Sequence, residues 1–148
     1  MFQFGNRSQA TLLTVKPALQ KLAMTAISLS DIDFGVVQGA RTIDQQKRLF
    51  GHGRTAVQCQ NHGVPTAYAR PDLPVVTWTL NSNHIGGNAI DVCPFADGTY
   101  DWDNDGRKGY WPRVHAAFVA ASRQTGIPMY WGGEFSTPDR PHFSLVPG

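Results

Sequence analysis

The sequence predicts an α+β fold, in which about three helices surround a small, mainly antiparallel sheet. Two observations indicate this class: helical signals recur in three separate segments, and short strand-like runs stand between them. The chain has 148 residues, 41% hydrophobic and 16% charged, which is enough for one core and too little for two of comfortable size. We therefore expect a single domain over residues 1–148.

The first helix is expected to start from a cap at Thr14 and to run to about Leu29. Apolar residues recur there at spacings of three and four, Pro17 falls in the first turn, and Thr14 is the expected N-cap. A short strand over residues 33–37 follows. This helix is a core element that carries no visible chemistry.

A second helix is expected from Thr42 to about Phe50. Thr42 and Gln45 have the spacing of a capping box, which places Arg41 beside the N-terminus of the helix. A cation next to exposed helix-start N–H groups suits a substrate carboxylate or a developing oxyanion. The alternative is an ordinary solvated arginine.

Residues 51–74 are rich in Gly, Pro, Asn and Gln and show little periodicity, which predicts a long excursion that could form the wall of a cleft. His52 and His62 lie in it, and we expect solvated side chains rather than metal ligands. The next predicted strand, over residues 75–80, leads to the stretch that begins at Ser82.

A candidate metal site follows from His84, Asp91 and His142. Two glycines after His84 allow a tight turn, and the short buried strand that follows can carry Asp91 back toward the histidine. Residues 141–146 alternate like a second strand of the same sheet, which would bring His142 from far away in the chain. Two imidazoles and one carboxylate match a catalytic zinc site with an open fourth position. An ordinary loop histidine followed by a strand carboxylate is the alternative.

An acidic turn follows, in which Asp101, Asp103, Asp105 and Gly106 occupy positions one, three, five and six of a calcium loop. The twelfth position holds Pro112 where such a loop needs a bidentate Glu. We therefore favour a solvated acidic turn over a Ca²⁺ site.

The third helix is expected over residues 111–124, ending at Gly126, and a strand over residues 127–131 follows it. Two carboxylates after this strand, Glu134 and Asp139, compete for the role of general base.

The motifs around these residues resemble one known family. Ser82-x-His84-x-x-Gly87-x-Ala89-x-Asp91 fits the signature of the zinc D,D-peptidase and L-alanyl-D-glutamate peptidase family, which cuts peptidoglycan stem peptides. Asp139-Arg140-Pro141-His142-Phe143 matches the closing motif of that family. The resemblance extends from about residue 13 to residue 145, and small single-domain phage endolysins are the most similar members.

The resemblance implies roles for individual residues. It makes His84, Asp91 and His142 the zinc ligands and Asp139 the general base, with Glu134 as second choice. It places Arg41 opposite the scissile peptide. It favours a substrate contact for Ser82, for which a turn serine or a residue that orients a ligand are the alternatives. Gln46 matches a glutamine of the family motif, and the neighbouring Gln45 also suits the pattern. Both are therefore kept as candidates for that position.

The reaction that the resemblance implies is hydrolysis of the L-alanyl-D-glutamate bond, because this branch carries Asp-x-Pro-His where the D,D branch carries Glu. A D,D-carboxypeptidase or dipeptidase of wall remodelling and a non-catalytic wall-binding relative are the alternatives. We expect no separate wall-binding domain and a monomer.

Net charge and targeting signals indicate where the protein acts and what it approaches. The net charge of +2 and pI near 8.7 favour approach to an anionic polymer such as a cell wall. The sequence lacks the clustered basic stripe that is typical of a nucleic-acid binder. Cys59 and Cys93 are expected to be unpaired thiols. With no secretory signal or membrane span, we expect accumulation in the host cytoplasm until a phage-encoded membrane-permeabilising partner, a holin, allows release to the cell wall.

Overall fold

The computed structural model describes residues 1–147. It contains two compact units: a larger one built from Met1–Ala40 and the chain from Gly87 onward, and a smaller one built from Arg41–Gly86. The predicted α+β class is confirmed, with five α-helices in the described residues where three were expected. None of these helices is both long enough and apolar enough to cross a membrane.

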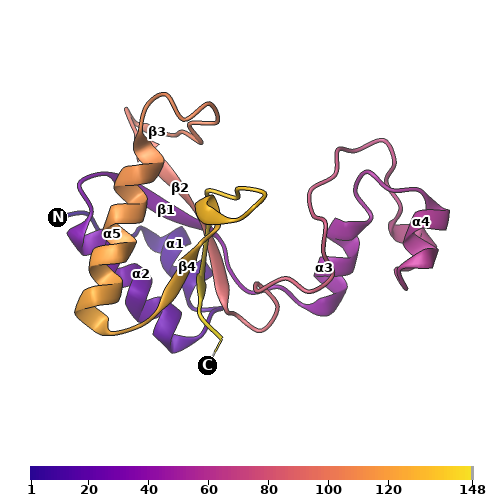
Figure 1. The fold of residues 1–148 in the computed structure, drawn as a ribbon, viewed down its shortest axis with the longest axis horizontal. Coiled ribbons are helices and arrows are strands. Elements are labelled where there is room, and N and C mark those ends of the chain that lie inside the picture. Colours follow the sequence, from indigo (N-terminus) through magenta and orange to yellow (C-terminus); the bar gives the residue numbers. More distant parts are fainter. Residues whose placement is uncertain (148) are drawn as a thin grey trace. The chain divides into compact units, whose positions relative to one another are not determined.

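The larger unit contains an antiparallel sheet (Figure 1). Its strands are β1 (Asp33–Gln38), β2 (Ala89–Ala96), β3 (Thr99–Tyr100), β4 (Met129–Trp131) and β5 (His142–Leu145). The order is β1-β2-β5-β4, and β3 pairs with β2. The central strands β2 and β5 are those for which burial and alternation predicted a common sheet.

Three helices belong to the same unit: α1 (Asn6–Leu12), α2 (Pro17–Leu29) and α5 (Tyr110–Thr125). Helix α2 begins at Pro17, so Thr14 is not the cap that was expected. Lys16 holds that position, and the Thr14 hydroxyl instead accepts the N–H of Ala40 at 3.0 Å. Helix α5 is capped at its C-terminus by Gly126, as predicted, and Gly126 has the left-handed conformation.

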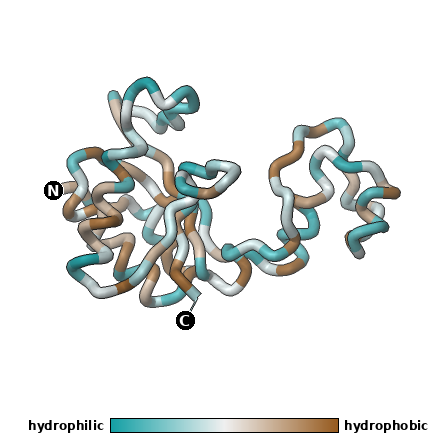
Figure 2. The backbone as a smooth tube through the Cα atoms, in the orientation of Figure 1, coloured by the Kyte–Doolittle hydropathy of each residue, from teal (hydrophilic) through white to brown (hydrophobic). Residues whose placement is uncertain are grey.

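The core of this unit lies where α2 and α5 pack against each other and against the sheet. Phe118 of α5 stacks on Phe143 of β5 with ring centroids 3.9 Å apart, and Phe34 of β1 contacts Phe118 at 5.6 Å. All three side chains are buried, and each such burial contributes about 2–3 kcal/mol. Figure 2 shows hydrophobic residues, in brown, recurring along these helices and strands, whereas the loop after β3 is mainly teal. Strand β5, which carries His142, is therefore fixed by the core.

The smaller unit contains α3 (Ile43–Phe50), α4 (Ala56–Asn61) and a 3-10 turn, η1 (Thr66–Tyr68). The capping box at Thr42 is confirmed. The expectation of a structureless excursion was wrong for α4, which begins at a second capping box formed by Thr55 and Gln58.

The strand predicted over residues 75–80 is also wrong, since this segment is irregular. One of its backbone carbonyls, that of Thr79, accepts a hydrogen bond from the Gln46 side chain at 2.8 Å.

Candidate metal centre and active site

Strands β2 and β5 place Asp91 and His142 directly opposite each other in the antiparallel ladder. Side chains at such a pair lie on the same face, with Cβ atoms about 5 Å apart. His142 is buried at 6% exposure, and Asp91 is half-buried. One strand pair therefore delivers an imidazole and a carboxylate to the same point.

His84 lies in a turn of the smaller unit and is 3% exposed. The Ser82 hydroxyl accepts the N–H of His84 at 3.2 Å, and the His84 carbonyl accepts the N–H of Arg41 at 2.9 Å. These contacts fix the backbone of His84 and place Arg41 beside it in the chain fold.

The predicted turn after His84 is present, with Gly86 and Gly87 both at φ +79°. Glycine is favoured at position 87 both by this φ and by the space, because a Cβ there would lie 3.0 Å from the backbone of Val15. The close approach is held by the Gly87 carbonyl, which accepts the N–H of Lys16 at 3.0 Å. Only glycine adopts this φ readily and leaves room for that close approach.

His84, Asp91 and His142 each offer a ligand atom, and these atoms all lie within 4.8 Å of one another. Ligands about 2.1 Å from one zinc ion at tetrahedral angles lie roughly 3.4 Å apart, so a small side-chain adjustment brings the three to a single ion. Two imidazoles and a carboxylate are also the donor types of a catalytic site with an open position. The three residues could hold a divalent metal ion.

Asp139 begins the turn that leads into His142. The N–H of His142 donates to the Asp139 carbonyl at 3.1 Å, and the Asp139 carboxylate lies 4.0 Å from His142 Nδ1. The Asp139 side chain is 56% exposed, so it is accessible to a substrate. A carboxylate is thereby tethered beside a candidate ligand.

The turn is braced by residues 131–134. The N–H of Asp139 donates to the Gly132 carbonyl at 2.7 Å, and Trp131 Nε1 donates to the Arg140 carbonyl at 2.8 Å. A Cβ at Gly132 would collide with the Asp139 carbonyl and lie 2.8 Å from His142 Cβ. The glycine-rich turn therefore sets the position of Asp139.

Glu134, the second candidate base, is exposed and lies 3.5 Å from His115 Nε2. His115 stacks on Trp131 with ring centroids 4.2 Å apart. Burial lowers the pKa of His115, and the Glu134 carboxylate opposes that shift. Glu134 thus interacts with α5, whereas Asp139 is hydrogen-bonded into the turn of His142.

Arg41 is oriented by a buried glutamine. Its Nη1 donates to Gln46 Oε1 at 3.0 Å, and Gln46, fully buried, donates in turn to the Thr79 carbonyl and the Thr77 hydroxyl at 2.8 and 3.3 Å. Gln45 instead completes the capping box by accepting the N–H of Thr42 at 2.8 Å. The sequence pattern did not decide which of the two glutamines matches the family residue. In the structure only Gln46 of the two is hydrogen-bonded to the Arg41 guanidinium. The two threonines were missed because a lone Thr carries no signal in one sequence.

Comparison with known proteins identifies the family. The family model for phage L-alanyl-D-glutamate peptidase matches residues 1–64, and the model for D-alanyl-D-alanine carboxypeptidase matches residues 76–145. The L-alanyl-D-glutamate peptidase of Escherichia phage T5 is 31% identical over 147 residues, covering 99% of this chain and 91% of that protein. The chain belongs to the L-alanyl-D-glutamate peptidase family.

A solved structure agrees with this assignment. The L-Ala D-Glu endopeptidase ChiX of Serratia marcescens superposes on this peptidase with a TM-score of 0.72 and 29% identity, covering 98% of this chain and 90% of that one. The family and the α+β fold inferred from the sequence are both confirmed.

The acidic turn of the peptidase is built by its own hydrogen bonds. Asp103 is 3% exposed, so it is not solvated as expected, and it accepts the N–H groups of Lys108 and Tyr110 at 3.0 and 3.2 Å. Asp101 pairs with the Lys108 ammonium, which lowers the pKa of Asp101. These contacts fix the start of α5.

The remaining candidates lie outside the three-residue metal group. His62 is exposed and bonded to the Gln58 carbonyl at 2.9 Å, and His52 is half-buried. Cys59 and Cys93 are buried, free thiols, and burial raises the pKa of Cys93 to about 11.

Proposed function

We propose that this chain is a zinc-dependent endolysin that hydrolyses the L-alanyl-D-glutamate bond of the peptidoglycan stem peptide. The single observation that carries the proposal is the convergence of His84, Asp91 and His142 on one point, with Asp139 tethered beside His142. The names of the T5 and ChiX relatives supply the bond.

In this mechanism, His84, Asp91 and His142 would hold the zinc ion. When bound, zinc supplies a water of pKa about 7 and polarises the substrate carbonyl as a Lewis acid. Asp139 takes the proton of the attacking water and passes it to the nitrogen of the leaving D-glutamate, so that the C–N bond breaks to a neutral amine. The exposure of Asp139 and its position in the His142 turn support this role.

Arg41 stabilises the negative charge that develops on the carbonyl oxygen, and pairing with the acidic stem peptide is its alternative role. Its backbone bond to His84 and its hold by Gln46 support a fixed position close to a metal ligand. Ser82 contacts the substrate or orients His84, to whose N–H it is bonded. Glu134 remains a proposed substrate contact, and Gln45 is the weaker candidate for one because its side chain completes the capping box.

Digestion of purified peptidoglycan followed by mass spectrometry tests the proposal. The expected products are fragments with a new N-terminal D-glutamate and glycan-linked L-alanine. Loss of a terminal D-alanine would instead establish a D,D-carboxypeptidase, which the match of that family model to residues 76–145 favours as second candidate. No cleavage at all would indicate a non-catalytic wall-binding relative.

We also propose, from the phage source of the T5 relative, that the peptidase accumulates as a monomer in the host cytoplasm and reaches the wall after a holin opens the membrane. Expression in a bacterial host with and without a holin tests this. Lysis should require the holin, and lysis by the peptidase alone would contradict the proposal.

A further inference from the structure

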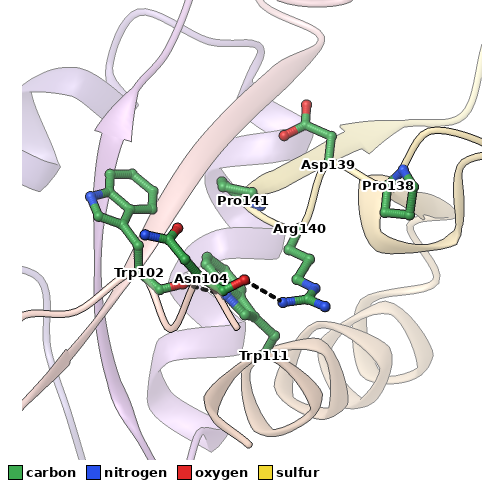
Figure 3. A pocket seen from close by; sticks show the side chains of 7 residues that line it. All are labelled: Trp102, Asn104, Trp111, Pro138, Asp139, Arg140 and Pro141. Atoms are coloured by element: carbon green, nitrogen blue, oxygen red, sulfur yellow. Dashed lines mark hydrogen bonds between the residues drawn. The ribbon is translucent and has the colours of Figure 1, made fainter. Parts of the chain in front are cut away.

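An open pocket of about 290 Å³ lies beside Asp139 in the larger unit (Figure 3). The lining residues come from the acidic turn, the start of α5 and the Asp139 turn: Trp102, Asn104, Trp111, Pro138, Asp139, Arg140 and Pro141. Ligand pockets in proteins start at roughly 300 Å³, so this one suits a group of amino-acid size. Apart from Asp139, the mechanism above uses none of these residues.

Arg140 provides the cation of this pocket. Its Nη1 donates to the Asn104 carbonyl at a long 3.5 Å, and its guanidinium lies 3.1 Å from the point where a Cβ at Gly106 would stand. Gly106, at φ +70°, therefore makes room for it.

No ion pair within residues 1–147 includes Arg140, and the two acidic-turn carboxylates that form ion pairs do so with other cations. Asp101 pairs with Lys108, and Asp105 lies 3.7 Å from Arg107. A guanidinium carries five N–H donors in a planar fork that matches a carboxylate. Arg140 thus keeps donors for an external anion.

Trp102 provides an apolar wall. It is 42% exposed, and its carbonyl accepts Trp111 Nε1 at 2.7 Å, which fixes its backbone. Figure 3 shows the Arg140 guanidinium directed toward Asn104 and Trp111, whereas the Asp139 carboxylate points away from it. The lining therefore has a cation at one end, a carboxylate at the other, and an aromatic surface that can cover methylene groups.

We propose that this pocket binds the free carboxylate of the D-glutamate residue next to the cleaved bond, and that Arg140 is the specificity residue that pairs with it. The proposal rests on the proposed function. D-Glutamate has two carboxyl groups, and at most one can continue the peptide, so the other carries a negative charge unless it is amidated. Because Arg140 follows Asp139 directly, an ion pair with Arg140 would hold the D-glutamate residue of the substrate in a fixed position relative to the base.

The experiment uses the full chain with zinc and two synthetic stem peptides that differ in one group, a free carboxylate or a carboxamide on D-glutamate. Arg140→Gln removes the proposed partner. Arg107→Gln is the matched control, since it removes the same charge from the neighbouring loop, where its side chain is 88% exposed. For each enzyme, kcat and KM are measured on both peptides.

The wild type should cleave the carboxylate peptide about 10- to 100-fold more efficiently than the carboxamide peptide, as expected for a charge-assisted hydrogen bond. Arg140→Gln should lose this preference through the carboxylate peptide alone, and Arg107→Gln should keep it. An equal loss on both peptides, or an unchanged preference, would overturn the assignment of Arg140.

Binding separates this inference from the proposed function. Should the wild type cleave neither peptide nor peptidoglycan, the proposed function fails. Calorimetric titration with the two D-glutamate peptides then tests the pocket alone. The pocket assignment is supported if the wild type binds the carboxylate peptide more tightly and Arg140→Gln loses this preference. Equal binding of both peptides by the wild type refutes it.

Discussion

Asp139 and His142 share one turn but serve different proposed steps, and substitution can separate them. Asp139→Ala removes the base and keeps all three candidate ligands, so zinc should stay bound while kcat falls roughly 100-fold or more. His142→Ala removes a ligand and should abolish stoichiometric zinc. Metal content and turnover, measured on the same samples, check both expectations. Full activity in Asp139→Ala would exclude this residue from the mechanism.

Gln46 and Gln45 offer a second comparison between neighbouring residues. Gln46→Leu leaves the Arg41 guanidinium without its 3.0 Å acceptor, so kcat/KM should fall about 10-fold or more. Gln45→Leu breaks the capping box, which costs about 1 kcal/mol of stability and should leave kcat/KM near wild type. Steady-state kinetics and thermal unfolding of both variants separate the two effects. A large kinetic loss in Gln45→Leu would show instead that Gln45 contacts the substrate.

At the scale of elements, the turn that joins His84 to β2 depends on Gly87. Gly87→Ala forces a Cβ to φ +79° and to within 3.0 Å of the Val15 backbone, so we expect about 2–3 kcal/mol of destabilisation and weaker zinc binding. Gly98→Ala is the matched control, because Gly98 has φ +80° with nothing within 4 Å. It should cost about 1 kcal/mol and leave zinc affinity unchanged. Chemical denaturation and zinc titration measure both, and equal losses would contradict a steric role for Gly87.

The same elements show what a single sequence predicts well. Periodicity and capping rules found α2, α3 and α5, since these depend on residues close in the chain. The rule that found α3 applies equally to Thr55 and Gln58, so α4 could have been predicted. Residues 75–80 have the composition of a strand, but strand formation needs a pairing partner, which composition does not reveal.

At the scale of the whole molecule, the candidate site could be predicted from the sequence because its chemical groups are concentrated in two motifs. His84 and Asp91 lie in one motif and His142 in the other, and strand patterning predicted that Asp91 and His142 share a sheet. The strand order β1-β2-β5-β4 and the grouping of Arg41–Gly86 into a unit of its own arise from packing between distant residues. Neither leaves a local signal.

The dispersion of the ligands along the chain gives the last prediction. Residues 84, 91 and 142 meet only when the chain is folded, so a bound ion should stabilise the native state. At a free zinc concentration of 100 times Kd the gain is about 2.7 kcal/mol, which raises Tm by about 5–10 °C for a chain of this size. A chelator should lower Tm, and added zinc should restore it, whereas magnesium should not.

His142→Ala is the control for this measurement, since it keeps the fold's other contacts but loses a ligand. Its Tm should not respond to zinc or to the chelator. If zinc stabilised this variant as strongly as the wild type, the ion would bind elsewhere. If the wild-type Tm were insensitive to both reagents, His84, Asp91 and His142 would not form a metal site that is coupled to folding, and the hydrolytic mechanism would lose its basis.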